Sequence, residues 1–263
     1  MPDIVAERSG SILRIQLNRP AKKNALTSSM YGTIADLLDG AAKDDRTRVV
    51  LWHGAGDSFT AGNDLEDFVK NPPAPNGSPQ ARLNDALINF PKPLVAAVHG
   101  AAIGSGTTML MYCDFVYAAE GTRFQLPFIN LGLVPEFGSS FSLPSRLGYI
   151  RAAELILLGQ PFDASQAAAL GLVTRVVPVG TALAVTNDIA HTLAAKPAAA
   201  LQACKRLMTG PLREQVAHAA RVEAEEFAAR VRSADAKEAF TAFFEKRRPD
   251  FTKTQTAEAA HGG

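Results

Sequence analysis

Apolar and polar positions along the chain switch between the spacing typical of strands and the spacing typical of helices. Two apolar-rich runs within residues 4–18 flank a polar turn at residues 8–10, which predicts a β-hairpin. Residues 28–43 carry apolar side chains at helical spacing, and the apolar run within residues 48–54 is typical of a buried strand. Because strand-then-helix units recur further along the chain, the pattern predicts an α/β protein with largely parallel sheets.

Two segments indicate how the chain is organised. Residues 71–80 contain four prolines, which predicts an extended surface loop and a candidate rim of a binding site. Beyond residue 196 the strand signals stop, and helical patterns continue to Phe244. We therefore expect a core with the active site over residues 1–195. We expect a helical oligomerisation subdomain over residues 196–263, with an amphipathic helix that packs on the core or on a neighbouring subunit.

Composition excludes several classes of protein. The 263 residues are 47% hydrophobic and 20% charged, which is typical of a soluble globular chain and excludes disorder as the main state. Lys and Arg total 27 against 26 Asp and Glu, so the net charge is too small to attract nucleic acid or an anionic membrane to the protein as a whole. The 2 cysteines match neither a metal-ligand spacing nor a disulfide framework, and we expect no metal and no redox cofactor.

Targeting signals favour a cytoplasmic location. The first ten residues carry charges where a signal peptide needs an apolar core, and the ending EAAHGG is no peroxisomal address. The run at residues 94–113 has no formal charge and is long enough to span a bilayer. However, His99, Gly100, Gly104 and Gly106 interrupt it, so we expect a buried strand, a turn and a buried helix there, and no membrane partner.

Glycine-containing turns follow several of the predicted strands. The turn GAGDSF at residues 54–59 begins like a dinucleotide-binding fingerprint, but Phe59 stands where the third glycine is needed. In IGSGTT at residues 103–108, a nucleophile elbow at Ser105 would need glycine two residues earlier, where Ile103 stands. The sequence therefore favours neither dinucleotide binding nor serine hydrolysis.

The backbone of two such turns has another possible use. Residues 104–106 open a predicted helix, so free N–H groups and the positive end of the helix dipole point outward together. FTAGNDL at residues 59–65 repeats the arrangement and offers the N–H of Asn63. Two such donors aimed at one carbonyl make an oxyanion hole, each worth roughly 3 kcal/mol at the transition state. The alternative is that both segments are plain turns.

Glu136 is the one charged residue between Arg123 and Arg146. Removing a carboxylate from water costs free energy unless it is paired or hydrogen-bonded, so Glu136 either lies on a solvated loop or is buried for a purpose. In the second case, desolvation would raise its basicity toward that of a proton-abstracting base.

Segments covering nearly the whole chain resemble the enoyl-CoA hydratase/isomerase, or crotonase, superfamily. These segments, in family order and spacing, are LNRPAKKNAL, SFTAGNDLEDF, VHGAAIGSGTTMLMYCDFVYA, FQLPFINLGLVPEFGSSFSLPSRLG and ALGLVTRVV. The resemblance implies a crotonase-like superhelix of repeated ββα units with a helical C-terminal trimerisation region. It also implies a homotrimer or a dimer of trimers. The substrate would be an acyl-CoA thioester, so coenzyme A is part of the substrate and no separate cofactor is needed.

The resemblance also assigns roles to residues. The N–H groups of Asn63 and Ser105 would hold the thioester carbonyl. Family hydratases use two glutamates, at the positions of Thr108 and Phe128 here, whereas Glu136 matches the single glutamate of the peroxisomal-type Δ3,Δ2-enoyl-CoA isomerases. The residues expected to line the substrate and CoA site are Lys22, Lys23, Ala25, Ala61, Gly62, Asp64, Leu65 and Gly104.

Two features of this assignment stay open. Lys22 and Lys23 are expected to meet CoA phosphates, the alternative being two solvated charges. Phe137 stands where the isomerases usually have glycine, and its bulk reshapes the acyl tunnel in a direction the sequence does not give.

Three hypotheses about function follow. The first is an isomerase that moves a 3-enoyl-CoA double bond to position 2, with Glu136 as the proton shuttle. The second keeps the site but changes the reaction to hydration or another step through a thioester enolate. The third, from a different class, is a non-catalytic acyl-CoA binding protein.

Overall fold

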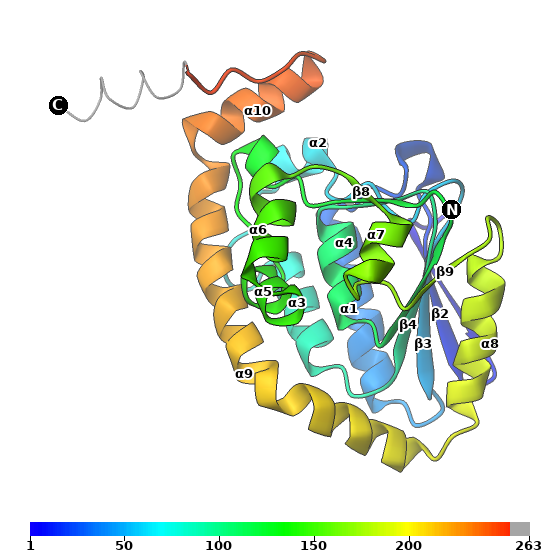
Figure 1. The fold of residues 1–263 in the computed structure, drawn as a ribbon. Coiled ribbons are helices and arrows are strands. Elements are labelled where there is room, and N and C mark those ends of the chain that lie inside the picture. Colours follow the sequence, from blue (N-terminus) through cyan, green and yellow to red (C-terminus); the bar gives the residue numbers. More distant parts are fainter. Residues whose placement is uncertain (253–263) are drawn as a thin grey trace.

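A six-stranded sheet forms the centre of the computed structural model, which describes residues 1–252 (Figure 1). Its strands, in spatial order, are β1 (Ile4–Ser9), β2 (Ile12–Leu17), β3 (Val49–Gly54), β4 (Leu94–Val98), β6 (Phe115–Ala119) and β9 (Arg175–Val177). The predicted hairpin is the antiparallel β1–β2 pair, and every other pairing in this sheet is parallel. The α/β class with largely parallel strands is therefore confirmed.

A second, smaller sheet lies at the carboxyl ends of the central strands. It contains β5 (Ala101–Ile103), β7 (Arg123–Gln125) and β8 (Phe162–Asp163). The chain passes from β4 to β5 and then into the short helix α4 (Ser105–Thr108), and it passes from β6 to β7 in the same way. A strand in each sheet followed by a helix is the repeated ββα unit that the resemblance implies.

Helices cover both faces of the central sheet (Figure 1). They are α1 (Ser28–Lys43), α2 (Leu65–Lys70), α3 (Pro79–Asn89), α5 (Ser139–Leu147), α6 (Tyr149–Leu158), α7 (Ala164–Ala169), α8 (Ala182–Ala194), α9 (Ala198–Val231) and α10 (Ala234–Phe244). In β3, Val50 and Trp52 join the main core with α1, while Val49 and Leu51 face α8 on the other side. Burial on both faces explains the unbroken apolar run of this strand.

Helix α1 has the bounds that the apolar spacing predicts. Thr27 caps it, because its side chain accepts a hydrogen bond from the Met30 N–H. The proline-rich segment differs from prediction at its end, since α3 begins at Pro79 and takes in the last two residues of the predicted loop. Ser78 caps α3 through the Ala81 N–H, and proline suits the first helical position because that amide needs no partner.

The C-terminal part is helical, as predicted. Helix α9 is 34 residues long and runs around the outside of the core to α10 (Figure 1). The last part of the predicted subdomain, residues 253–263 with the ending EAAHGG, lies outside the described residues.

Within residues 1–252, no helix combines the length and hydropathy needed to cross a membrane. The uncharged run at residues 94–113 forms β4, β5, α4 and a 3-10 helix at Met109–Tyr112 instead. In the same part of the chain, no group of three His, Cys, Asp or Glu residues is placed to hold a metal ion.

Two loops meet at the carboxyl end of β5. Thr60 pairs with Ala102 in an isolated parallel bridge, so the turn after β3 lies directly against the second sheet. Gly62 has φ +84°, and a Cβ atom added there would stand 2.5 Å from the carbonyl oxygen of Ile103. Glycine is therefore required at residue 62 both for its backbone conformation and for the close approach of the two loops.

We predict that Gly62→Ala destabilises the fold by about 2–3 kcal/mol, because alanine must adopt positive φ and also push the two loops apart. Gly121→Ala is the matched control, since Gly121 has φ +76° with no atom within 4 Å of the added Cβ. That control should lose only about 1 kcal/mol. Urea unfolding of both variants measures the difference, and equal losses would show that the close approach carries no energy.

Candidate active site

The larger of two neighbouring cavities holds both predicted oxyanion turns. It has a volume of about 540 Å³. Its walls include most of the residues predicted for substrate binding, namely Lys22, Ala25, Ala61, Gly62, Asn63, Asp64, Leu65, Gly104 and Ser105. Lys23 is exposed and is not part of this lining. Phe227, Phe243 and Phe244 from α9 and α10 complete the wall.

The first turn directs the Asn63 N–H away from Leu26, its partner in an isolated backbone bridge. Leu26 pairs with Asn63 in a parallel bridge, donating to the Gly62 carbonyl at 2.8 Å and accepting from the Asp64 N–H at 2.9 Å. In such a bridge the central residue uses neither of its own backbone groups. Its N–H is therefore free to donate to a bound group.

The second turn presents the Ser105 N–H at the start of α4. Gly104 precedes it with φ 56° and ψ −119°, and the Gly104 N–H is fixed to the Gln125 carbonyl at 2.9 Å. Because Ser105 is the first residue of the helix, its N–H has no carbonyl one turn earlier to bond. Within the described part of the chain, neither this amide nor that of Asn63 donates to a backbone carbonyl outside regular secondary structure.

Asp64 and Lys22 are engaged within the protein. The Asp64 side chain caps α2 by accepting from the Asp67 N–H, and it pairs with Arg19 at 3.0 Å. Partial burial acts to raise its pKa, but the Asp67 N–H and the Arg19 guanidinium outweigh this and lower the pKa. Lys22 lies 3.7 Å from Glu66 in an exposed pair, which leaves its ammonium accessible to an anion.

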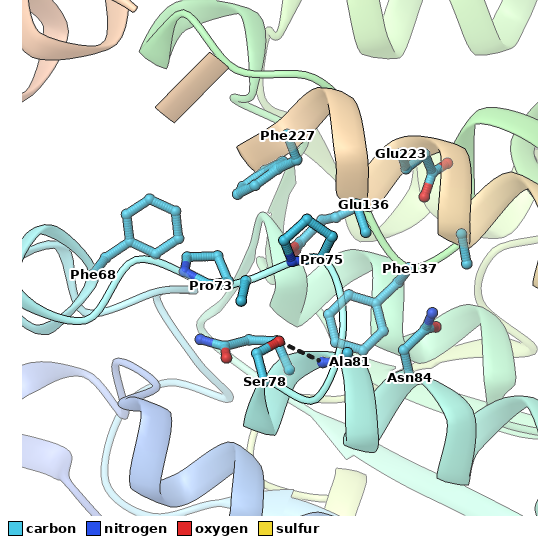
Figure 2. A pocket seen from close by; sticks show the side chains of 14 residues that line it. Phe68, Pro73, Pro75, Ser78, Ala81, Asn84, Glu136, Phe137, Glu223 and Phe227 are labelled. Atoms are coloured by element: carbon cyan, nitrogen blue, oxygen red, sulfur yellow. Dashed lines mark hydrogen bonds between the residues drawn. The ribbon is translucent and has the colours of Figure 1, made fainter. Parts of the chain in front are cut away.

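Glu136 lines the smaller cavity, which has a volume of about 60 Å³ (Figure 2). Its side chain is half-buried, but its Oε1 atom is fully buried and has no hydrogen-bond partner in the described structure. Desolvation, followed by the negative charge of Glu223, raises the pKa of Glu136 to about 8. The burial expected from the isolated charge is present, and a solvated loop glutamate is not what the structure shows.

The loop that carries Glu136 is held from two sides. Phe137 and Gly138 both have positive φ, at 56° and 67°. From α9, Glu223 accepts hydrogen bonds at 2.6 Å from the N–H groups of Gly138 and Ser140. The Tyr112 hydroxyl donates to the Phe137 carbonyl. These contacts stabilise a backbone conformation that a bulky residue such as Phe137 adopts only at a cost.

Phe68 and Phe227 line both cavities. Their rings meet edge to face with centroids 5.8 Å apart. The structure thus does not place Glu136 in the wall of the cavity that holds Asn63 and Ser105. The two aromatic rings stand at the boundary between the cavity lined by Glu136 and the cavity lined by the two turns.

Three residues that contact the candidate site were not predicted from the sequence: Tyr112 and Glu223, described above, and Tyr31, whose hydroxyl lies 2.6 Å from Asn63 Oδ1. Tyr31 occupies the buried face of α1 three residues before Ile34, and its apolar neighbours give it the appearance of a core residue. Glu223 did carry a usable signal, because it lies between Ala220 and Phe227 on the apolar face of α9. A carboxylate on the buried face of a helix is as unusual as Glu136 in its loop.

The two hydratase positions carry no carboxylate. Thr108 is buried, and its hydroxyl lies 3.3 Å from the Ser105 carbonyl oxygen and 3.5 Å from that of Gly104. Phe128 is buried and contributes its ring to the wall of the larger cavity.

We predict that Glu136→Gln unfolds at higher urea concentration than the parent at pH 9. The folded-state pKa of about 8 exceeds the ordinary 4.5, so the neutral carboxyl stabilises the fold fully below pH 4.5. That contribution is lost as the pH rises to 8. Glutamine stays neutral, and the expected gain in the free energy of unfolding is about 2–4 kcal/mol at pH 9, shrinking toward zero at pH 5.

Glu225→Gln, exposed on α9, is the control. Parallel pH profiles for parent and Glu136→Gln would contradict a buried carboxyl.

Comparisons with known proteins agree with this geometry. The enoyl-CoA hydratase/isomerase family model matches residues 7–255. Enoyl-CoA delta isomerase 2 of Rattus norvegicus is 41% identical over 187 residues, covering 68% of this chain and 47% of the relative. This chain thus spans about half the length of that relative. The 2,3-dehydroadipyl-CoA hydratase of Escherichia coli is 33% identical over 258 residues, covering 95% of this chain and 99% of that enzyme.

Solved structures confirm the crotonase-like fold. The structure of Pseudomonas aeruginosa OdaA is 43% identical, has a TM-score of 0.90, and is matched over 92% of this chain and 99% of that one. An enoyl-CoA hydratase/isomerase from Pseudoalteromonas atlantica is 40% identical, also with a TM-score of 0.90, over 95% of this chain and 100% of that one. The relatives carry both isomerase and hydratase names, so the comparisons do not distinguish between these two reactions. The chain belongs to the enoyl-CoA hydratase/isomerase family.

Proposed function

We propose that the protein is an acyl-CoA isomerase that moves the double bond of a 3-enoyl-CoA to position 2 through a thioester enolate. Glu136 is the proton shuttle, and the N–H groups of Asn63 and Ser105 hold the enolate oxygen. The proposal is supported above all by one observation, the buried and unpartnered Oε1 atom of Glu136.

Among the carboxylates that line the two cavities, Glu136 is the one suited to act as a base. The Asp64 carboxylate is held by Arg19 and by the start of α2, and Glu66 is exposed. Glu223 uses one oxygen for each of two backbone N–H groups. Glu136 combines a raised pKa with a free oxygen, which are the two properties that proton abstraction next to a carbonyl demands.

The reaction needs one base and no external reactant. The Glu136 carboxylate takes a proton from carbon 2, and the electrons of that C–H bond form the enolate as the thioester oxygen becomes negative. The two amides stabilise this oxygen. The enolate then reforms the carbonyl, the double bond settles between carbons 2 and 3, and carbon 4 receives the proton from Glu136. Atoms and charge balance without any cofactor beyond the CoA of the substrate.

Hydration is the alternative, and the full-length similarity to the Escherichia coli hydratase is the observation that favours it. The usual family mechanism needs two carboxylates, one to activate water and one to protonate carbon 2. Thr108 and Phe128 occupy those positions here and supply neither function. Isomerisation therefore accounts for the residues present with fewer added assumptions.

The proposal extends to CoA and to assembly. We place the CoA phosphates near Lys22 at the rim of the larger cavity, with the exposed Lys23 beside it. We also propose a homotrimer or a dimer of trimers. Exposed apolar side chains on α6 and α9 support an interface there, namely Tyr149, Ile150, Leu157, Leu158, Leu207, Met208 and Leu212.

We predict that the purified protein converts a 3-enoyl-CoA to its conjugated 2-enoyl isomer, and that Glu136→Gln lowers kcat by at least about 1,000-fold because no base remains. Glu225→Gln should retain parental activity. Absorbance of the conjugated thioester measures the reaction, and its loss from a matching 2-enoyl-CoA measures hydration. Full activity in Glu136→Gln, or hydration as the faster reaction, would overturn the proposal. Tight CoA binding without turnover would indicate a binding protein.

We further predict that kcat/KM for isomerisation rises with pH and levels off above an apparent pKa near 8. The base must be ionised in the free enzyme, and burial raises its pKa to about 8. Initial rates between pH 6 and pH 10 measure the profile. A kcat/KM that is already constant across this range, as for a base with the ordinary glutamate value of 4.5, would show that the group acting as base is not a buried carboxylate.

A further inference from the structure

Tyr31 touches three parts of the proposed active site from a single position on α1. It is fully buried, and its hydroxyl lies 2.6 Å from Asn63 Oδ1 and 2.7 Å from Ser105 Oγ. Its ring stacks on Phe137, the residue directly after Glu136, with centroids 6.3 Å apart and planes at 29°. Tyr31 is absent from the linings of both cavities, so it acts from behind the site.

The chemistry of the three groups fixes the direction of this hydrogen-bond chain. A phenol has one proton, and an amide oxygen such as Asn63 Oδ1 can only accept. Tyr31 therefore donates to Asn63, and the buried Ser105 hydroxyl donates to Tyr31. Burial first, and then the nearby Glu136 carboxylate, raise the pKa of Tyr31 well above its ordinary value, so the phenol keeps the proton that the chain needs.

The two residues joined by this chain are the ones whose amides form the oxyanion site. Each of these amides belongs to a peptide plane that follows a glycine, Gly62 before Asn63 and Gly104 before Ser105. Glycine allows wide rotation about its backbone bonds, so without a tether the direction of the next N–H is weakly specified. Anchoring both side chains to one phenol restricts both planes together.

We propose that Tyr31 is a positioning residue that aligns the Asn63 and Ser105 amides on the thioester oxygen through the Ser105–Tyr31–Asn63 hydroxyl chain. The inference rests on the proposed oxyanion site. It adds a role for the Asn63 and Ser105 side chains, which the proposed reaction otherwise does not use. Misaligned amides weaken charge stabilisation in the transition state more than they weaken ground-state binding.

Tyr31→Phe tests this directly, because it removes the hydroxyl and keeps the ring that stacks on Phe137. We expect kcat to fall about 10-fold with little change in KM, less than the roughly 100-fold cost of losing an oxyanion donor outright. Tyr117→Phe, in buried β6, is the control and should match the parent.

An infrared measurement separates alignment from general destabilisation. Butanoyl-CoA labelled with carbon-13 at the thioester carbonyl cannot react, and hydrogen bonds from the two amides lower its carbonyl stretching frequency. We expect a clear downshift on binding to the parent and to Tyr117→Phe, and a smaller one on binding to Tyr31→Phe. Should Tyr31→Phe fail to fold, Asn63→Ala and Ser105→Ala break the same chain from its two ends and should each reduce the downshift.

The Asn63→Ala/Ser105→Ala background provides the decisive comparison. If Tyr31 acts through these side chains, adding Tyr31→Phe there should change kcat by less than about 2-fold. A full 10-fold loss in that background, or an unchanged downshift and kcat in Tyr31→Phe alone, would overturn the inference. No downshift in the parent would instead refute the oxyanion site on which the inference rests.

Discussion

The close approach of the loop at residues 60–63 to β5 is the constraint on which the rest of the site depends. Thr60 bonds into the small sheet, and Gly62 leaves no room for a side chain against the Ile103 carbonyl. This contact brings two amides without strand partners to one cavity. A fold can leave such donors unpaired only where a ligand or water satisfies them, because a buried orphan amide costs as much as a lost hydrogen bond. The two free amides therefore support the proposed oxyanion site, and the surrounding backbone bridges hold them in place.

Glu136 is an unpaired acceptor, whereas the two amides are unpaired donors, and its burial must likewise be stabilised by its surroundings. An ionised carboxylate with a buried, unpartnered oxygen is unfavourable, and the positive φ of Phe137 adds strain beside it. Glu223 and Tyr112 offset these costs by fixing the backbone that follows Glu136. Glu223 does so with a negative charge, so the group that stabilises the loop also raises the pKa of Glu136. Burial is the larger cause of the raised pKa of Glu136, and Glu223 on α9 adds to it while it also supports the loop.

Local patterns predicted much of this molecule, and contacts between distant segments account for what they missed. The bounds of α1 follow from apolar spacing, and a lone charge in an apolar run drew attention to Glu136, although only the structure shows that its Oε1 atom is buried. Pro79 looked like loop because four prolines dominate its neighbourhood, yet proline suits a helix start. Tyr31 joins Asn63 and Ser105 across 32 and 74 residues of sequence, a meeting that no local spacing reveals. The division into two cavities likewise depends on where Phe227 of α9 meets Phe68 of α2.

The number of available carboxylates argues for isomerisation more strongly than the position of any one of them. Within residues 1–252, four acidic side chains line the two cavities, and Glu223 is the one that could be mistaken for a second catalytic acid. Both of its oxygens already accept backbone hydrogen bonds, and releasing either would free the loop that carries Glu136. A reaction that returns to carbon 4 the proton it took from carbon 2 needs no second acid. The proposed isomerisation therefore needs only one carboxylate, which acts first as base and then as acid.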